Sequence, residues 1–484
     1  MISASSASSR RRAAVLGAGI SGLASAELLR THGFEVAVFS QAPLETGYEV
    51  VVDESADSLA KKVTDYAPEL VVASPGIPEH SPLIQAPLSA GIRVIGEVQL
   101  AWDLSHTCEG EQVAPKWLCV TGTNGKTTTV GMTAAILAAA GYRAPEVGNI
   151  GYPITRAIQE PADVLVVELS SFQLATSPDL EPSAAICLNI DSDHIDWHGD
   201  RKSYAAAKSR VYDHVDRARI FFDDEPETEE MAQNGTDSEG SRLVSLKFGS
   251  AVKGAVGVKD GAVIDCAFTD DGRAEVLFYL ADVPLLASAD LSNPASDPLV
   301  RDALAAAALA RSFGVSSKDV LKGLSDFVPQ GHRRAPVPTS DGVRWVDDSK
   351  ATNVHAALAA ARSVEPGTLI WIVGGDAKGQ DLSPVFEFAA KQAKALVLVG
   401  ADPEPLIALR DTYAPKTAMT VAGSGPDGAS VLRSAVRACA EIAVPGDTVL
   451  LAPGCASWDQ FNSYGERGDA FAEAIRELEV AEGS

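Results

Sequence analysis

A lysine set among glycines and hydroxyl side chains stands in the stretch TGTNGKTTT, residues 121–129. Gly122 and Gly125 allow the backbone to fold closely around phosphate oxygens, because glycine has no side chain. Lys126 can then place a positive charge on the terminal phosphates, and Thr127 can offer its hydroxyl to Mg²⁺. The stretch therefore predicts a loop that binds the phosphates of a nucleotide.

The neighbours of this loop favour the same interpretation. The apolar run WLCV comes before it and the helix-like run VGMTAAILAAAG follows it, which gives the order strand, loop and helix of phosphate-binding loops. Val120 stands where the standard loop has its first glycine, so the loop is shortened. The alternative is a glycine-rich turn that only caps an ordinary helix.

Two further strand ends carry residues suited to a metal ion beside this loop. The run DVLVVELSSFQL ends a buried strand on Glu168, and a buried carboxylate is costly unless it is paired or binds a metal. The run LNIDSDHIDWHG offers His194 after another strand. His194 and His198 are spaced like a zinc-binding pair, but no third ligand follows nearby. His198 is interpreted as structural, and for His194 the residues alone leave both interpretations open.

The glycines Gly17, Gly19 and Gly22 of the run GAGISG have the spacing of dinucleotide-binding proteins. The acidic residue expected after the second strand is missing, because the run EVAVFSQAP has Ser40 there. NAD would lose its usual ribose partner, so the glycines predict only a phosphate-bearing ligand at the start of a helix. A signal peptide is the disfavoured alternative, since charged residues interrupt the following helix.

Three polar clusters follow apolar strands in the last third of the chain, in the runs WVDDSKATN, GGDAKGQD and LLAPGCASWDQFNSYGERG. Ligands of α/β proteins bind at the carboxyl ends of parallel strands. Each cluster alone is compatible with turn chemistry, because Gly, Asp and Ser are common turn residues. Three clusters on consecutive strand ends favour a binding site.

The composition excludes several classes of protein. The 484 residues carry 65 acidic and 40 basic side chains, and the net charge of −25 repels nucleic acid and anionic membranes. The six cysteines form no CxxC pair and are expected to be reduced thiols. No apolar run reaches the roughly 18 residues that a membrane span needs. We expect a cytoplasmic monomer that acts on small molecules, binds no nucleic acid and does not insert into membranes.

Short apolar runs alternate with helical patterns over most of the chain, which predicts parallel sheets covered by helices, the α/β class. The expected strands are AAVLGA, EVAVFS, LVVAS, RVIG, WLCVTG, DVLVVELS, AAICLNI, ARIFF, LIWIVGG, ALVLVG and DTVLLAP. Linkers are expected at residues 105–115 and 327–338. The polar segment 223–242 is expected to be an exposed acidic loop without chemistry.

The motifs VTGTNGKTT, VVELSSFQL, HRRAPV with VDDSKATN, GGDAKG and APGCASWDQFNSYGERG occur in the order and approximate spacing of the Mur ligases. The chain resembles this family over nearly its whole length, and SSFQL and CASWDQF are the most specific motifs. The Asn-Pro-Arg signature of members that add the third amino acid is absent. The resemblance implies three domains: a Rossmann-like domain at 1–111, a central P-loop ATPase-like domain with a mostly parallel sheet at 112–330, and a Rossmann-like domain at 331–484.

The resemblance implies an ATP-dependent ligase that needs Mg²⁺, of the branch that adds D-glutamate to UDP-N-acetylmuramoyl-L-alanine in peptidoglycan precursor synthesis. The alanyl carboxylate would take the γ-phosphoryl group of ATP, and the amine of D-glutamate would then displace phosphate from the acyl phosphate. Lys208 is implied to be a carbamylated metal ligand, which requires CO₂, although the residues alone predict a solvated helix lysine. The alternatives are another Mur-type or folylpolyglutamate-synthetase-like ligase, an ATP-binding regulator without turnover, and an NAD-dependent dehydrogenase.

The resemblance also implies roles for residues at the family's motif positions. Those for ATP are Gly122, Thr123, Asn124, Gly125, Lys126, Thr127, Thr128, Asp302, Arg333, Asp348 and Lys350. Those for the UDP-linked substrate are Gly19, Ile20, Ser21, Ser74, Pro75, Gly76 and Asn149, and those for D-glutamate are Thr352, Lys378, Ser457 and Tyr464. The metal ligands would be Thr127, Glu168, His194 and Lys208, and the catalytic residues Lys126, Glu168, His194 and Lys208.

Two positions depart from the pattern of the Mur ligases. Ser40 stands where an acidic residue often contacts uracil, so uridine must be recognised differently. Asp302 stands where an asparagine contacts adenine, so that contact does not carry over unchanged.

Overall fold

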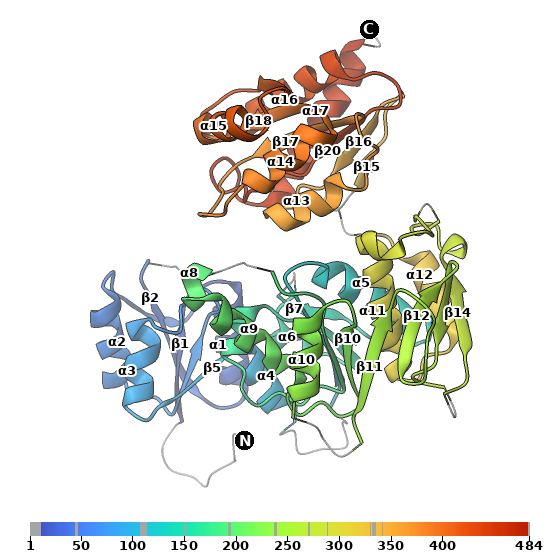
Figure 1. The fold of residues 1–484 in the computed structure, drawn as a ribbon. Helices are drawn as coiled ribbons and strands as arrows, with labels where there is room; N and C mark the ends of the chain where they lie inside the picture. The colour runs from blue at the N-terminus through green and yellow to red at the C-terminus, as the bar shows by residue number, and fades with distance from the viewer. Residues whose placement is uncertain are drawn as a thin grey trace. The chain divides into compact units, whose positions relative to one another are not determined.

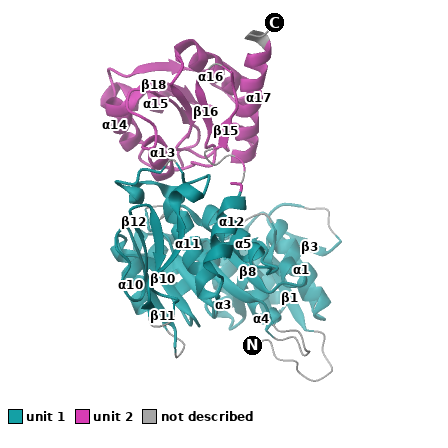
Figure 2. Cartoon of the chain, turned by 90° about the vertical axis from the view of Figure 1, so that its right-hand side faces the viewer, with its two compact units in different colours: residues 1–327 teal, residues 328–484 magenta. Residues whose placement is uncertain are grey.

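The protein is described by a computed structural model that divides into two compact units, residues 1–327 and 328–484 (Figure 2). The described residues are 11–43, 47–106, 114–149, 152–191, 195–236, 240–269, 272–287, 289–329, 331, 335–340 and 342–482. His194 and Arg333 lie outside them, as does Cys108. Within these residues no helix has the length and apolar character that crossing a membrane requires.

The first sheet has five parallel strands in the order β3-β2-β1-β4-β5 (Figure 1). The strands are β1 (Arg12–Leu16), β2 (Glu35–Ser40), β3 (Glu49–Val52), β4 (Leu70–Ala73) and β5 (Arg93–Gly96). The helices of this part are α1 (Ile20–Thr31), α2 (Ala56–Asp65), α3 (Pro82–Ser89) and α4 (Glu97–Ser105). Ala13 and Val15 of β1 enter one apolar cluster and Ala14 and Leu16 another, so apolar packing covers both faces of the sheet.

The second sheet has nine strands in the order β14-β13-β12-β11-β10-β9-β6-β8-β7. The strands from β6 to β12 pair in parallel, and β13 and β14 add an antiparallel edge. The bounds are β6 (Lys116–Thr121), β7 (Glu146–Gly148), β8 (Val164–Glu168), β9 (Ala184–Cys187), β10 (Ala218–Phe222), β11 (Arg242–Lys247), β12 (Ala255–Lys259), β13 (Ala262–Asp265) and β14 (Glu275–Tyr279).

Helices cover both faces of this sheet. Leu118 and Val120 of β6 pack with α5 (Lys126–Ala139), α11 (Pro298–Ser312) and α12 (Ser317–Asp326). Trp117 and Cys119 of the same strand belong to the cluster on the opposite face. The helices with residues in that cluster are α4, α6 (Ile154–Ala157), α7 (Ser171–Ala175), α9 (Arg201–Ser209) and α10 (Pro226–Asn234).

The prediction of an acidic loop at 223–242 is wrong, because α10 lies inside this segment and β11 begins at its end. Pro226 occupies the start of α10, where its fixed φ suits a helix. Glu227 and Glu229 lie in the first turn, where a negative charge stabilises the helix dipole. Met231 is buried against the sheet. The acidic residues thus promote helix formation here.

The second unit holds a six-stranded sheet in the order β15-β16-β20-β17-β18-β19, parallel except for the β15–β16 pair. The strands are β15 (Ala335–Val337), β16 (Arg344–Asp347), β17 (Leu369–Gly374), β18 (Ala393–Val399), β19 (Ala418–Val421) and β20 (Thr448–Leu451). The helices are α13 (Val354–Ala361), α14 (Ser383–Gln392), α15 (Glu404–Tyr413), α16 (Gly428–Ile442) and α17 (Tyr464–Glu482). The α/β class predicted from the sequence is confirmed.

Helix α4 connects the first sheet to the second through polar contacts. The backbone N–H of Gly96 donates to the carbonyl of Thr176 at 2.9 Å, and Gln173 Nε2 donates to Glu97 Oε1 at 3.0 Å. Glu97 is only 4% exposed, and this burial raises the pKa of its carboxyl group. Both sheets of the first unit are therefore held together by specific hydrogen bonds at the start of α4.

Candidate active site

The loop after β6 is folded around the ammonium group of Lys126. Gly122 and Gly125 have φ values of 149° and 85°, which side chains disfavour. Lys126 Nζ donates to the carbonyl oxygens of Gly122 at 2.8 Å and Thr123 at 3.0 Å. The start of α5 adds the partial positive charge of a helix N-terminus. The loop therefore has the backbone shape and the charge to bind phosphate groups.

Asn189 fixes the conformation of this loop, although its sequence context does not single it out. Its Oδ1 accepts the backbone N–H groups of Thr123 at 3.1 Å and Asn124 at 2.9 Å, and its Nδ2 donates to the Asn124 carbonyl at 3.2 Å. Asn189 follows β9, which pairs with β6. The available sequence signal is its place after a strand that neighbours the loop-bearing strand.

Glu168 lies beside the loop at the carboxyl end of β8, where it pairs with Val120 of β6. It is 2% exposed, and its Oε2 accepts the hydroxyl of Thr127 at 2.7 Å. Asn149 Nδ2 donates to its Oε1 at 3.0 Å. The structure thus brings Thr127 and Asn149, two of the predicted residues, into contact with the buried carboxylate of a third, Glu168.

Lys208 also reaches the loop, so the solvated helix lysine expected from the residues alone is wrong. Lys208 is 2% exposed, and its Nζ donates to Thr121 Oγ1 at 3.2 Å and to the Gly122 carbonyl at 2.9 Å. It lies in the last turn of α9, whose inner face also carries the buried Tyr204. The ammonium lies 5.0 Å from the centre of the Tyr204 ring. The helix turns this lysine toward the sheet.

Asp302 of α11 packs directly against the phosphate-binding loop. It is 6% exposed and accepts the hydroxyl of Thr129 at 3.2 Å. A Cβ atom built on Gly125 would lie 2.5 Å from Asp302 Oδ1, so the loop backbone passes close to this carboxylate. His198, in contrast, bonds Ser171 Oγ through Nε2 at 2.9 Å, in keeping with a structural role.

The glycine-rich turn of the first sheet is a second candidate binding feature, separate from the loop after β6. A Cβ on Gly17 would lie 2.6 Å from Ser74 Oγ, and one on Gly22 would lie 2.0 Å from the Gly17 carbonyl oxygen, so both positions require glycine. Ser74 Oγ is buried and has no hydrogen-bond partner among the described residues. Helix α1 begins at Ile20, which is 73% exposed, and Gly19 provides no side-chain cap. The uncapped helix start and the hydroxyl suit a phosphate-bearing ligand.

In the second unit, Arg467 holds two of the three polar clusters together. It is 2% exposed, and its Nε and Nη2 donate to Ser349 Oγ at 3.0 Å and to the Ser349 carbonyl at 2.8 Å. Its Nη1 donates to the Cys455 carbonyl at 3.1 Å. Burial lowers the pKa of this guanidinium group to about 10. Arg467 thereby joins the loops that follow the neighbouring strands β16 and β20. Sequence motifs alone do not assign this function to Arg467.

The predicted residues of the second unit lie on these strand ends. Lys350 Nζ lies 5.1 Å from the ring centre of Tyr464, which is 37% exposed. Thr352 donates its backbone N–H to the Lys350 carbonyl at 2.8 Å. Ser457 is 3% exposed and accepts the N–H of Phe461 through its carbonyl at 2.7 Å. The sheet order places β16, β20 and β17, whose carboxyl ends carry the three clusters, side by side.

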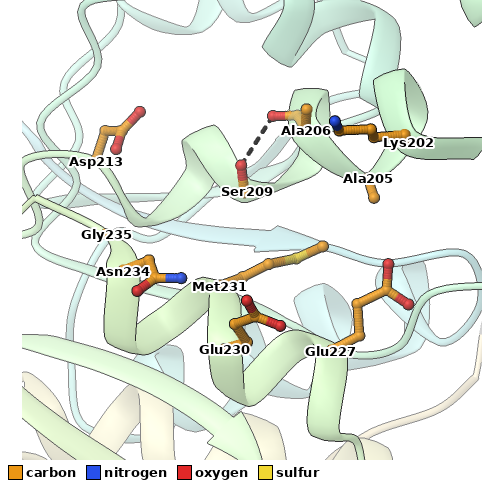
Figure 3. Close-up of a pocket in the computed structure, with 10 residues that line it drawn as sticks. All are labelled: Lys202, Ala205, Ala206, Ser209, Asp213, Glu227, Glu230, Met231, Asn234 and Gly235. Carbon is orange, nitrogen blue, oxygen red and sulfur yellow. Dashed lines mark hydrogen bonds between the residues drawn. The ribbon is translucent and has the colours of Figure 1, made fainter.

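A cavity of about 300 Å³ lies between α9 and α10 (Figure 3). Its lining residues are Lys202, Ala205, Ala206, Ser209, Asp213, Glu227, Glu230, Met231, Asn234 and Gly235. None of the predicted site residues is among them. The cavity is therefore distinct from the phosphate-binding loop.

The fold and the loop define an α/β nucleotide-binding protein with a buried carboxylate next to its phosphate site. Comparison with known proteins makes this class more specific. Residues 11–96 match the Mur ligase MurD-like N-terminal domain, residues 120–277 the Mur ligase middle domain, and residues 332–455 the Mur ligase glutamate ligase domain.

Relatives match nearly the whole chain. A UDP-N-acetylmuramoylalanine--D-glutamate ligase of Streptomyces coelicolor is 40% identical, with 97% of this chain and 98% of the relative covered. A protein of the same name from Mycobacterium avium is 38% identical over 96% of each chain. The solved UDP-N-acetylmuramate-alanine ligase of Thermotoga maritima is 17% identical and shares the fold with a TM-score of 0.55, covering 97% of this chain and 99% of its own. The chain belongs to the Mur ligase family.

Proposed function

We propose that this chain is an ATP-dependent ligase that joins D-glutamate to UDP-N-acetylmuramoyl-L-alanine in peptidoglycan precursor synthesis. The observation that carries the proposal is the phosphate-binding loop, in which Lys126 and the Thr127–Glu168 pair lie next to one another. This arrangement suits transfer of a phosphoryl group. The names of relatives that match nearly the whole chain support this substrate pair.

The chemistry activates a poor electrophile. A carboxylate oxygen of the alanyl group attacks the γ-phosphorus of ATP, the bond to the bridging oxygen breaks, and ADP leaves. The amine of D-glutamate then attacks the carbonyl carbon of the acyl phosphate, loses a proton and displaces phosphate. Lys126 would stabilise the negative charge on the transferred phosphoryl group.

The residues beside the loop fit Mg²⁺. The carboxylate of Glu168 and the hydroxyl of Thr127 are oxygen donors, which Mg²⁺ prefers, and they already contact one another at 2.7 Å. Bound Mg²⁺ would compensate negative charge on the ATP phosphates. His194 and carbamylated Lys208 would complete the set of metal ligands that the family implies.

Carbamylation of Lys208 would resolve a conflict of charge at the loop. Lys126 and Lys208 both donate to the Gly122 carbonyl, at 2.8 and 2.9 Å, so two ammonium groups lie close together. Like charges at short distance repel, most strongly in a buried site. Addition of CO₂ would turn the Lys208 ammonium into an anionic carbamate, which attracts Lys126.

The other ligands would be bound by the remaining strand ends. We propose that Gly19, Ile20, Ser21, Ser74, Pro75, Gly76 and Asn149 contact the UDP-linked substrate. Backbone and side-chain groups of Gly122 to Thr128, with Asp302, Arg333, Asp348 and Lys350, would contact ATP, and Thr352, Lys378, Ser457 and Tyr464 would contact D-glutamate. Ser40 donates its hydroxyl to the Ala42 carbonyl at 2.7 Å, and a different group would recognise uracil.

We retain three domains, 1–111, 112–330 and 331–484, as part of the proposal, because each has its own sheet. ATP, the UDP-linked substrate and D-glutamate would each be bound mainly by one of them. Closure would exclude water, which otherwise hydrolyses the acyl phosphate. We place this monomeric enzyme in the cytoplasm, where ATP and nucleotide-linked precursors are available.

Release of inorganic phosphate tests the proposal. The enzyme is incubated with UDP-N-acetylmuramoyl-L-alanine, Mg-ATP and one candidate amino acid at a time. We expect phosphate release with D-glutamate and little with D-alanine or L-glutamate. Stimulation by a different amino acid would identify another ligase of this type, and ATP binding without any turnover would identify a regulator.

A further inference from the structure

The ammonium group of Lys378 lies over an exposed indole ring. Its Nζ is 3.9 Å from the centre of the Trp458 ring, and Trp458 is 68% exposed. Among the described residues, the Lys378 ammonium forms no ion pair with a carboxylate. A large aromatic side chain with this much exposure requires an explanation, because burying it would be favourable.

The backbone holds the two side chains in this arrangement. Lys378 has φ of 47°, a left-handed conformation that is uncommon outside glycine and clusters at functional sites. Its N–H donates to Asp376 Oδ1 at 2.9 Å. The backbones of Asp376 and Ala456 exchange two hydrogen bonds of 3.0 and 2.8 Å, which tie the loop of Lys378 to the loop of Trp458.

We propose that Trp458 is a positioning residue for the amino-acid substrate. It acts by holding the Lys378 ammonium in place to meet D-glutamate. The inference rests on the proposed function, in which Lys378 binds a carboxylate of D-glutamate. A long lysine side chain has many rotamers, and a substrate must otherwise fix them when it binds. The ring restricts these rotamers in advance.

The indole ring is suited to this function in two ways. Its face attracts a cation without neutralising it, so the ammonium keeps its charge for the incoming carboxylate. A carboxylate in place of the ring would compete with the substrate carboxylate for the ammonium group. The ring also covers one side of the ammonium, and fewer water molecules must leave when the substrate carboxylate arrives.

The experiment compares Trp458→Leu and Trp458→Phe with the wild-type enzyme, each substrate being varied in turn. We expect Trp458→Leu to raise the KM for D-glutamate about three- to tenfold, the range of a partly exposed cation–π contact, and Trp458→Phe to raise it less. The kcat and the KM values for ATP and the UDP-linked substrate should stay within twofold. Tyr413→Leu is the matched control, because Tyr413 is another exposed aromatic residue of the second unit, on α15.

A double-mutant cycle with Lys378→Met shows whether the ring acts through the lysine. If it does, Trp458→Leu has no further effect on kcat/KM for D-glutamate in the Lys378→Met background. An unchanged KM in Trp458→Leu, or equal effects of that substitution in both backgrounds, would overturn the inference. Wild-type turnover with D-glutamate in the same assay keeps the proposed function intact in that case, whereas absence of wild-type turnover would reject the proposed function itself.

Discussion

At the scale of single residues, the phosphate-binding loop is surrounded by buried or partly buried charged side chains. Lys126 and Lys208 reach the same carbonyl oxygen from different helices, and the loop has no side chain at Gly122 to separate them. Glu168 brings a buried carboxylate beside the loop, where it accepts the hydroxyl of Thr127. The proposed carbamylation of Lys208 would therefore relieve the repulsion between the two ammonium groups. Each charge can be tested by its removal.

Replacement of Lys126 by alanine removes a cation from the transferred phosphoryl group. We expect phosphate release at saturating substrates to fall by about two to three powers of ten, the effect of losing one electrostatic stabiliser. Lys202→Ala is the control, because Lys202 is an exposed lysine on α9. A Lys126→Ala enzyme that turns over within tenfold of wild type would contradict the assignment of the loop.

Lys208→Ala should be nearly inactive if Lys208 acts as a carbamate. A small soluble carboxylate such as acetate should restore part of the activity, because it can supply the lost anionic oxygens. The same acetate should not rescue Lys126→Ala, which lacks a cation. Wild-type protein equilibrated with ¹³C-bicarbonate should also give a carbamate NMR signal that Lys208→Ala lacks. Full activity of Lys208→Ala would show that this lysine is only structural.

At the scale of elements, apolar runs predicted eleven strands, among them the edge strand β5, and missed β11, β12 and β13 inside the second sheet as well as several edge strands. The unpredicted strands include β3, β7, β14, β15 and β19, each of which lies at the edge of its sheet. Edge strands have one paired side and need fewer apolar residues, so their pattern is weak. Residues in motifs, such as Lys126 and Glu168, were predictable because neighbouring strand ends bring them together.

Contacts between distant segments were not predictable from the sequence. Asn189 bonds a loop 65 residues away, and Arg467 bonds Ser349 across 118 residues. The burial of Lys208 depends on which face of α9 packs on the sheet, and the polar sequence RKSYAAAKS gives only a weak indication of that face. These details follow from tertiary packing.

The junction at α4 leads to a prediction about pH. Burial raises the pKa of Glu97 in the folded chain, so the folded state binds the proton more tightly than the unfolded state does. Stability of the wild type should therefore fall, relative to Glu97→Gln, as pH rises from the unfolded value of about 4.3 through the folded pKa. The measurement is the Tm of the wild type minus the Tm of Glu97→Gln, taken at pH 5 and at pH 8. We expect this difference to be smaller at pH 8, and the same difference at both pH values would contradict the prediction.

At the scale of the whole molecule, three sheets supply three separate sets of strand ends. Amide formation from a carboxylate requires that ATP, the carboxylate and the amine meet, and that water stays out until the amine has reacted. In the proposed arrangement each ligand is bound mainly at one sheet, and closure brings the ligands together. The acyl phosphate is the intermediate that makes such protection necessary.

Transfer of an oxygen atom from the alanyl carboxylate to phosphate tests most directly whether ligation passes through an acyl phosphate. UDP-N-acetylmuramoyl-L-alanine with both alanyl carboxylate oxygens labelled as ¹⁸O is turned over with Mg-ATP and D-glutamate, and the released phosphate is analysed by mass spectrometry. Attack of the carboxylate on the γ-phosphorus leaves one labelled oxygen in the phosphate and one in the new amide. We predict phosphate that carries a single ¹⁸O atom per turnover. Unlabelled phosphate would show that ATP is hydrolysed by water, and would contradict ligation through an acyl phosphate.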